Sequence, residues 1–471
     1  MSHYWRKIAI HLKNHYLRPL KASNYFRNAI VAIVRNGKKS AKRTEKAQEL
    51  DLIIESLSHE AHGVARHESK VVFVPSALPG EQVHVRLQKQ QRHFSQGQLM
   101  RIDQASEHRV EPSCPHFSRC GACQLQHLAT EQQLPHKQDN LHQQLTRQLK
   151  ITDIPWQAPI TSDGLGYRRR ARLGVRYRKQ QDEIIIGFRE EANKHLAAID
   201  TCPVLEPTLN ALIVPMQVCL SQLQAKAVIT QMELIASDQG SVVVLRHIKA
   251  IQKDDRLLLT SFAQQHACHL YLQGDDTLEC VYPETETALS YQVSGFDLEF
   301  QVKDFIQGNA KVNQAMVDLA GQWLDLKPNE TLLDLFAGIG NFSIPLASKV
   351  KSLLAVEGVG PMVQRIEHNA KRHNISNISA MALNLADEEL LFRLPKADAI
   401  LLDPPRTGAA TLMPWLCKQK SRILYIACEP SSLVRDAKPL LEAGFRIEKI
   451  TVMDMFPQTK HVESMALFVR D

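Results

Sequence analysis

The chain has 471 residues, 44% of them hydrophobic, which is enough apolar material for more than one buried core. It contains no run of about 18 uncharged apolar residues, and its N-terminus lacks the apolar segment and small-residue cleavage site of a secretory signal. Nine cysteines at irregular spacing argue against a disulfide framework. We therefore expect a cytoplasmic globular protein that makes no use of a membrane.

Positive charge is concentrated in residues 1–47, a basic N-terminal arm. This arm holds 12 of the 57 Lys and Arg residues but only one of the 50 Asp and Glu residues, so its balance is +11 and that of the remaining chain is −4. Such an arm is either a solvated tail or a segment that contacts nucleic acid phosphates. A start codon assigned too early is a third explanation, and a later start would then use a codon such as that of Val31, because the next methionine is Met100.

Residues 48–106 contain several short β-rich runs separated by Gly, Pro and polar residues. The runs are DLIIESL, SKVVFVP, EQVHVRL and QGQLMRI. This spacing predicts a small β-barrel of the OB-like kind. Small barrels often present a surface to oligonucleotides, although the same pattern also fits a purely structural module.

Residues 107–303 begin with a cysteine-containing loop and a predicted helix, TEQQLPHKQDNLHQQLTRQL, and continue as an irregular α+β region with strands such as RARLGVRY and SVVVLRHI. Cys114, Cys120 and Cys123 form a C-x5-C-x2-C pattern, and Cys202 lies 79 residues further on. Four thiolates can hold a [4Fe-4S] cluster or tetrahedral zinc, and spacing does not decide between them. A radical S-adenosylmethionine enzyme is excluded, because it would need C-x3-C-x2-C.

A basic stretch, YRRRAR, follows in the same region. It places Arg168, Arg169, Arg170 and Arg172 close to Tyr167. Guanidinium groups beside an aromatic ring suit phosphates and unstacked bases, so these arginines are candidate RNA contacts. A solvated strand face is the alternative.

Residues 304–471 show a different rhythm, in which apolar strands alternate with helical stretches. The strands are TLLDLFAGIGN, SLLAVEG, ISAMALN, ADAILLDPP and SRILYIAC. This alternation predicts an α/β fold, a doubly wound Rossmann-like sheet whose ligands gather at the carboxyl ends of its strands.

A glycine turn after the first of these strands, DLFAGIG, indicates a nucleotide site. Glu357 ends the next strand, 17 residues after Gly340, where a carboxylate can bind ribose hydroxyls. A nicotinamide nucleotide would explain a glycine turn too, but the GxGxxG pattern is absent, so the turn fits S-adenosylmethionine better. Asn384 closes the third strand, where its amide would meet an adenine edge or simply make a turn.

Asp403 closes the fourth strand in the sequence DPPR, where two prolines stiffen the loop and the carboxylate faces the same crevice. Asp-Pro-Pro at this place is found in methyltransferases that act on planar nitrogen-containing rings. An amino-group nucleic-acid methyltransferase is therefore one alternative, and it would need no thiol. A noncatalytic RNA-binding assembly factor is another, and it would need no intact cofactor loop.

Cys428 closes the fifth strand. A cysteine after ILYIA is often a small core residue, but the segment that follows, PSSLVRD, predicts a helix with serine at its N-cap. The start of a helix lowers a thiol pKa from its ordinary value of about 8.5. We therefore expect a thiol that is reactive at neutral pH.

The chain resembles the uracil-5-methyltransferases of RNA over residues 48–471, and most closely the members that act on bacterial 23S ribosomal RNA. The matching segments are CPHFSRCGACQLQH, YRRRARLGV, DTCPV, DFIQGNAKVNQ, LLDLFAGIGNF, LLDPPRTG, IACEPSSLVRD and HVESMALF. The resemblance implies that the barrel is a TRAM domain, that the substrate is 23S rRNA and that S-adenosylmethionine is the methyl donor. It suggests no protein partner and says nothing of the basic arm.

The resemblance also implies a role for particular residues. Cys428 corresponds to the thiolate that attacks carbon 6 of uracil, and Glu463 to the base that removes the carbon 5 proton. The four cysteines of the C-x5-C-x2-C pattern and DTCPV correspond to ligands of a [4Fe-4S] cluster. The cofactor-contacting positions are Gln307, Phe336, Asn341, Glu357, Asn384 and Asp403. The sequence reads FIQGNA where the family has FIQVNA, and we expect Gly308 to matter little.

Overall fold

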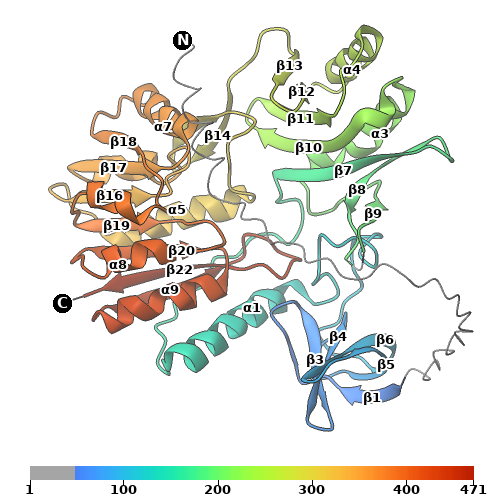
Figure 1. Ribbon diagram of the computed structural model, residues 1–471, viewed down its shortest axis with the longest axis horizontal. Helices are drawn as coiled ribbons and strands as arrows, with labels where there is room; N and C mark the ends of the chain where they lie inside the picture. The colour runs from blue at the N-terminus through green and yellow to red at the C-terminus, as the bar shows by residue number, and fades with distance from the viewer. Residues whose placement is uncertain (1–47, 192, 471) are drawn as a thin grey trace, which may run out of the picture. The chain divides into compact units, whose positions relative to one another are not determined.

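The structure of the protein, a computed structural model, describes residues 48–191 and 193–470 (Figure 1). The predicted basic arm lies outside these residues. Within them the strands form three sheets of six or seven strands and one two-stranded sheet. No helix in this part of the chain is long and apolar enough to cross a membrane.

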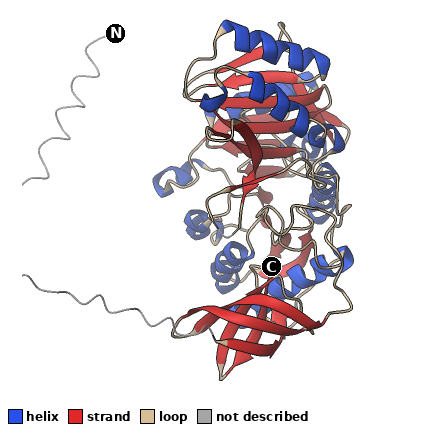
Figure 2. Cartoon of the chain, turned by 90° about the vertical axis from the view of Figure 1, so that its right-hand side faces the viewer, coloured by secondary structure: helices blue, strands red, loops and turns tan. Residues whose placement is uncertain are grey.

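The first sheet follows the order β1-β5-β6-β4-β3-β2, and Figure 2 shows its twist at the bottom of the view. Its strands are β1 (Glu49–Ile53), β2 (Ser56–Leu57), β3 (His62–His67), β4 (Lys70–Pro75), β5 (Gln82–Gln90) and β6 (Phe94–Gln104). Alternate residues such as Val83 and Val85 point into one apolar core, as the period of a strand requires. The end strands β1 and β2 do not pair with each other, so the predicted barrel is an open one.

The central sheet has the order β13-β12-β11-β10-β7-β8-β9. Its strands are β7 (Arg170–Arg178), β8 (Glu183–Arg189), β9 (Leu196–Ala198), β10 (Ile229–Ser237), β11 (Gly240–His247), β12 (His269–Gln273) and β13 (Leu278–Tyr282), and the helices of this region are α1 (Thr130–Gln144), α2 (Pro207–Asn210), α3 (Ile213–Gln222) and α4 (Lys253–Gln265). Ile213 and Leu259 pack α3 and α4 onto one face of the sheet. On the other face, Ile235 and Val244 join the apolar core of the C-terminal region.

After the hairpin of β14 (Leu289–Val293) and β15 (Phe296–Phe300), the C-terminal sheet has the order β18-β17-β16-β19-β20-β22-β21. Its strands are β16 (Thr331–Leu335), β17 (Ser352–Glu357), β18 (Ile378–Ala382), β19 (Ala399–Leu402), β20 (Arg422–Ala427), β21 (Arg446–Met453) and β22 (Glu463–Val469). The strands from β16 to β20 run parallel, whereas β22 runs antiparallel to both of its neighbours.

Helices cover both faces of this C-terminal sheet, as the alternating sequence pattern predicts. They are α5 (Ala310–Leu324), α6 (Ser343–Leu346), α7 (Gly360–Arg372), α8 (Met413–Leu416) and α9 (Pro430–Glu442). Met316 and Ile366 bring α5 and α7 into the core on one face, and Leu416 and Leu440 bring α8 and α9 into the core on the other. The predicted doubly wound fold is confirmed.

Helix α1 fixes the segment that leads into β22. The buried Lys137 Nζ donates a hydrogen bond to Asp454 Oδ1 at 2.7 Å, and Gln133 Nε2 donates to Gln458 Oε1 at 2.9 Å. A charge inside a protein is tolerated when it is paired in this way. These contacts set the position at which β22 begins, which is Glu463.

Candidate active site

The carboxyl ends of the parallel strands bring the predicted site residues to one edge of the C-terminal sheet. Glu357 ends β17, Asp403 follows β19, and Cys428 follows β20. Since β22 runs in the opposite direction, its first residue, Glu463, lies at the same edge beside the end of β20. The order of the strands reverses between β16 and β19, and ligands of such sheets bind at that point.

The glycine turn after β16 forms an open cradle. Phe336, Gly338 and Gly340 have φ angles of 63°, 58° and 94°, so the chain turns through the left-handed region that favours glycine. The Gly338 N–H donates to Glu357 Oε2 at 3.0 Å, and no atom would lie within 4 Å of a Cβ placed on Gly338. The turn therefore has free space in front of it beside a carboxylate, as a bound nucleoside requires.

The two predicted asparagines are used differently. Asn341 and Asn313 exchange reciprocal amide hydrogen bonds of 2.8 and 2.9 Å, and Asn341 Oδ1 also accepts one from Tyr291 Oη at 3.0 Å. The amide of Asn341 thus anchors the glycine turn to neighbouring elements. Asn384 is exposed, and its Oδ1 accepts from the Ala386 N–H at 3.1 Å, which makes it a turn residue at the rim.

Two carboxyl groups and an amide lie together in the crevice. Gln307 Nε2 donates a hydrogen bond of 3.2 Å to Asp403 Oδ2. Burial raises the pKa of Asp403 to about 7. Burial also raises the pKa of Glu463 to about 8, and the neighbouring Asp403 carboxylate contributes to this rise. Both carboxyls therefore change protonation near neutral pH, as general acids and bases do.

Cys428 lies in the same crevice, but its environment differs from the one predicted. The N-cap of α9 is Glu429 with Pro430 at the next position, so the prediction of a serine cap is wrong. The predicted lowering of the thiol pKa is wrong as well. The pKa of the thiol is raised to about 11, chiefly by burial and also by the Glu463 and Asp403 carboxylates, against a smaller opposing effect of Arg406. The free thiol therefore carries its proton at neutral pH.

A pocket opens from Cys428 toward the first sheet. It is lined by Arg406, Lys460 and His461 from the C-terminal region and by His59 and Glu60 from the turn between β2 and β3. Lys460 forms an ion pair with Glu60 across this opening. Lys460 and Glu60 were not predicted from the sequence, because a lone lysine or a turn glutamate carries no motif.

Gly308 matters more than we expected. A Cβ at this position would lie 2.8 Å from Cε1 of Phe456, so the ring packs directly on the glycine backbone. The Gly308 carbonyl also accepts from the Arg169 N–H at 3.0 Å. A valine here would displace the Phe456 ring, which the sequence pattern alone did not reveal.

The four predicted cluster ligands line one small cavity. Cys114, Cys120 and Cys123 approach it from the loop after the first sheet, and Cys202 approaches it from the segment after β9. Phe117, Phe188 and Ile199 complete an apolar wall. Gly121 lets the loop come close to the central region, because its N–H donates to the Arg189 carbonyl at 2.9 Å and a Cβ would lie 2.8 Å from the Glu191 nitrogen.

The sulfurs of this cavity suit a bound cluster. Each has a hydrogen-bond donor, and the donors are the N–H groups of His116, Phe117, Ala122 and Leu205 and the side chain of Gln126. Burial nevertheless raises the pKa of Cys123 to about 11 and that of Cys202 to about 12, so the thiolates need a positive group among them. Across residues 48–191 and 193–470, no three His, Cys, Asp or Glu side chains lie where they could hold a single metal ion.

The predicted RNA contacts at YRRRAR need correction. Tyr167 and Arg169 are buried, with 7% and 3% of their surfaces exposed, so neither reaches a base or a phosphate. Arg169 Nε donates to the Gln307 carbonyl at 2.6 Å, and Arg170 Nε donates to Glu233 Oε1 at 2.8 Å. The pattern was misleading because the strand is packed between regions and is not exposed along its length. Arg172 remains exposed, and Arg168 is partly buried over the Phe456 ring.

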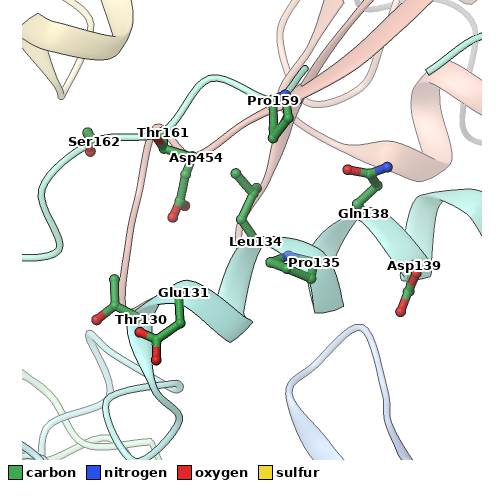
Figure 3. Close-up of a pocket in the computed structure, with 10 residues that line it drawn as sticks. All are labelled: Thr130, Glu131, Leu134, Pro135, Gln138, Asp139, Pro159, Thr161, Ser162 and Asp454. Carbon is green, nitrogen blue, oxygen red and sulfur yellow. The ribbon is translucent and has the colours of Figure 1, made fainter. Parts of the chain in front are cut away.

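A separate groove runs along α1 (Figure 3). Its charged side chains are Glu131, Asp139 and Asp454, and Asp454 is paired with Lys137. The remaining lining is apolar or uncharged, with Leu134 and Pro135 on the helix and Pro159 opposite. This groove is acidic, and it contains neither Cys428 nor Glu463.

Comparison with known proteins gives consistent results. A family profile described as tRNA (Uracil-5-)-methyltransferase matches residues 129–471, and a TRAM domain profile matches residues 43–100. The 23S rRNA (uracil(1939)-C(5))-methyltransferase RlmD of Shewanella sediminis is 41% identical over 423 residues, covering 89% of this chain and 96% of its own length. RlmD of Photorhabdus laumondii is 40% identical over 435 residues, covering 91% of this chain and 98% of its own length.

A solved structure has the same fold. It is the tRNA (uracil-54, C5)-methyltransferase of Pyrococcus abyssi, in complex with S-adenosyl-L-homocysteine. The TM-score is 0.69 at 21% identity, and the match covers 89% of this chain and all of that one.

Proposed function

The chain belongs to the tRNA (uracil-5-)-methyltransferase family, and from that premise we propose that it transfers a methyl group from S-adenosylmethionine to carbon 5 of a uridine in 23S ribosomal RNA. The uridine we propose is the equivalent of position 1939, because both RlmD relatives are named for that target. The observation that carries the mechanism is that Cys428, Asp403 and Glu463 lie together at one edge of the sheet. Burial raises the pKa of all three side chains, and nearby carboxylates contribute to the raised pKa values of Cys428 and Glu463.

Activation of the ring begins at Cys428. Carbon 5 of uracil is a weak nucleophile, and addition of Sγ to carbon 6 places electron density on it. Since the thiol is protonated, a base must accept its proton, and we assign that role to Asp403. The Gln307 amide occupies Oδ2 of this carboxylate, so the other oxygen takes the proton.

Glu463 completes the reaction. After methyl transfer, carbon 5 carries both its hydrogen and the new methyl group. The Glu463 carboxylate accepts this hydrogen as a proton, the electrons of the C–H bond restore the double bond, and the bond between carbon 6 and Sγ breaks. The departing thiolate recovers its proton from Asp403, which leaves only Glu463 to release a proton to solvent.

The methyl donor fits the residues present. S-adenosylmethionine supplies an electrophilic methyl group, and the cradle of Phe336, Gly338 and Glu357 would hold its nucleoside. The Glu357 carboxylate is held beside the turn by the N–H groups of Gly338 and Val359. Gln307 donates to the catalytic carboxylate of Asp403 at 3.2 Å.

We further propose that Cys114, Cys120, Cys123 and Cys202 hold a [4Fe-4S] cluster. The cavity, its apolar wall and its N–H donors support this assignment. The cluster would join the loop after the first sheet to the central sheet. No catalytic step is assigned to it.

The test of the catalytic assignment is the Glu463→Gln variant. We expect it to add Cys428 to the uridine, transfer the methyl group and then stall, because the carbon 5 proton has no acceptor. With a 23S rRNA fragment and a labelled methyl donor, a labelled protein–RNA band should appear on a denaturing gel, and Cys428→Ala in the same chain should remove it. General bases contribute about 10² to 10⁴ in rate, so the adduct should persist long enough to be isolated. Normal turnover by Glu463→Gln would overturn the assignment.

A further inference from the structure

A groove on the central sheet is lined by basic side chains that the catalytic mechanism does not use. Arg172, Arg176, Arg189 and Lys194 contribute to it, and all four are exposed. Arg172 shares Glu233 with Arg170. For Arg176, Arg189 and Lys194, the described residues provide no ion-pair or side-chain hydrogen-bond partner. Their charges are available to a ligand.

The pleat of the sheet explains this arrangement. Arg172, Gly174 and Arg176 are alternate residues of β7 and therefore share one face. Gly174 lies opposite Gly187 of β8, and the Leu196 side chain packs over Gly174, where a Cβ would lie 2.7 Å from Leu196 Cδ2. A Cβ on Gly187 would lie 1.7 Å from the Ala197 carbonyl oxygen, so no other residue fits there in this conformation. The cations thus surround a floor formed by the two glycines and the Leu196 side chain.

The same row of side chains begins beside the catalytic region. Arg170, the first member of the row, donates a hydrogen bond of 2.8 Å to the Val302 carbonyl and another to the Asp304 carbonyl. These carbonyls directly precede the segment that carries Gln307. On this face, Ile235 of the central sheet packs into the core of the C-terminal region. The basic groove therefore extends from the part of the face that contacts the catalytic region.

We propose that this groove binds the phosphate backbone of the rRNA strand that flanks the target uridine. The proposal rests on the proposed function and adds a second, noncatalytic contact surface to it. Arg172 and Arg176 are about 13 Å apart along the strand, which is room for more than one phosphate. The acidic groove along α1 in Figure 3 is unsuited to a polyanion, so the two grooves differ in the sign of their charge and only the basic one suits RNA.

The test is a triple variant, Arg176→Gln, Arg189→Gln and Lys194→Gln, in the full chain. Each lost phosphate contact lowers the slope of log K against log salt by about 0.7 for a single strand. We therefore expect the slope to fall by about 2 and the affinity for a 23S rRNA fragment to fall about 100-fold at 0.1 M salt and about 10-fold at 0.3 M. The rate at saturating RNA and the affinity for S-adenosylmethionine should stay unchanged.

The matched control removes the same charge elsewhere. Lys351, Lys418 and Lys420 are exposed and precede β17 and β20, at the opposite edge of the C-terminal sheet from Cys428. Their replacement by Gln should leave the slope unchanged. Equal slopes for wild type and the groove variant would overturn the proposal, and so would equal losses in both triple variants. Failure of the wild type to methylate the fragment would instead contradict the proposed function, so the two failures are distinguishable.

Discussion

The catalytic crevice and the cysteine cavity each contain buried side chains that can lose a proton. The two places differ in what surrounds those side chains. In the crevice, Cys428 and Glu463 have raised pKa values, with Arg406 and Lys460 only at the open mouth. In the cavity, Cys123 and Cys202 also have raised pKa values, but an apolar wall closes it. The first group can exchange protons with solvent and substrate. The second can become anionic only beside a permanent cation such as an iron cluster.

The difference shows how the same physical effect serves two purposes. Burial of neighbouring acids makes ionisation costly in both places. In the crevice this cost is useful, because groups that titrate near neutral pH can transfer protons during turnover. In the cavity the cost would be offset once, when the metal binds, and the four sulfurs would then remain thiolates.

The largest expected effect comes from removing the thiol of the crevice. Cys428→Ala should lower methyl transfer to 23S rRNA by at least about 10⁴-fold, because no other group can activate carbon 6. The iron content should stay at that of the wild type, since Cys428 lies outside the cysteine cavity. Methyl incorporation and iron analysis on the same preparation measure both.

Cys417→Ala is the matched control for that variant. Cys417 is also a partly exposed cysteine of the C-terminal region, and its Sγ donates to the Pro439 carbonyl at 3.3 Å. The Cys417→Ala variant should retain full methylation activity. Substantial methylation by Cys428→Ala would contradict the assignment of Cys428 as the thiol that reacts with uracil.

The second prediction concerns the cavity. Cys202→Ser should lose most of the iron, about four atoms per chain in the anaerobic wild type, and should lower the midpoint of thermal unfolding. Cys219→Ser is the control, because Cys219 is buried in the same core without lining the cavity, and it should keep its iron. Zinc in place of iron in anaerobically prepared wild type would contradict the assignment.

Sequence patterns predicted those parts of the molecule that depend on local periodicity or on a motif. The apolar strands of the C-terminal region determined its sheet, and the residues that follow them necessarily met at one edge. The cysteine spacing likewise led to one cavity. Patterns failed where tertiary packing decides. YRRRAR suggests an exposed basic strand, yet Arg169 is buried between two regions. The thiol after β20 suggests activation by a helix, yet burial and two carboxylates outweigh it.

The third prediction tests whether the cysteine cavity and the catalytic crevice are connected by contacts of the segment between them. Arg168 N–H donates to the Val204 carbonyl at 2.8 Å, close to Cys202, and Arg169 Nε donates to the Gln307 carbonyl at 2.6 Å. Arg169 also lies 4.4 Å from the ring centre of Tyr291. The segment therefore joins the cavity to the residue that holds Asp403.

Arg169→Met should displace Gln307 and lower kcat by about 10²-fold, the cost of roughly 1 Å of misplacement, without changing RNA affinity or iron content. Arg169→Lys should restore part of the rate, because an ammonium group can still reach the carbonyl. A loss of RNA affinity with unchanged kcat would show instead that Arg169 contacts RNA.

The smallest expected effect is on stability and comes from Glu463. Its pKa is about 8 in the folded protein and near 4.5 when exposed. Between these values the folded state retains a proton that the unfolded state has lost, so this group's contribution to stability falls as pH rises from about 4.5 to about 8. Glu463→Gln removes that dependence. The variant should unfold at nearly the wild-type temperature at pH 4.5 and at a higher temperature at pH 8.5, by about 1 °C for each kcal/mol gained in a chain of this length. The exposed Glu367→Gln should show no such divergence. If the unfolding temperatures of Glu463→Gln and wild type change in parallel with pH across this range, burial does not raise the pKa of Glu463. The crevice would then lack the carboxyl group that titrates near neutral pH, which is what distinguishes it from the cysteine cavity.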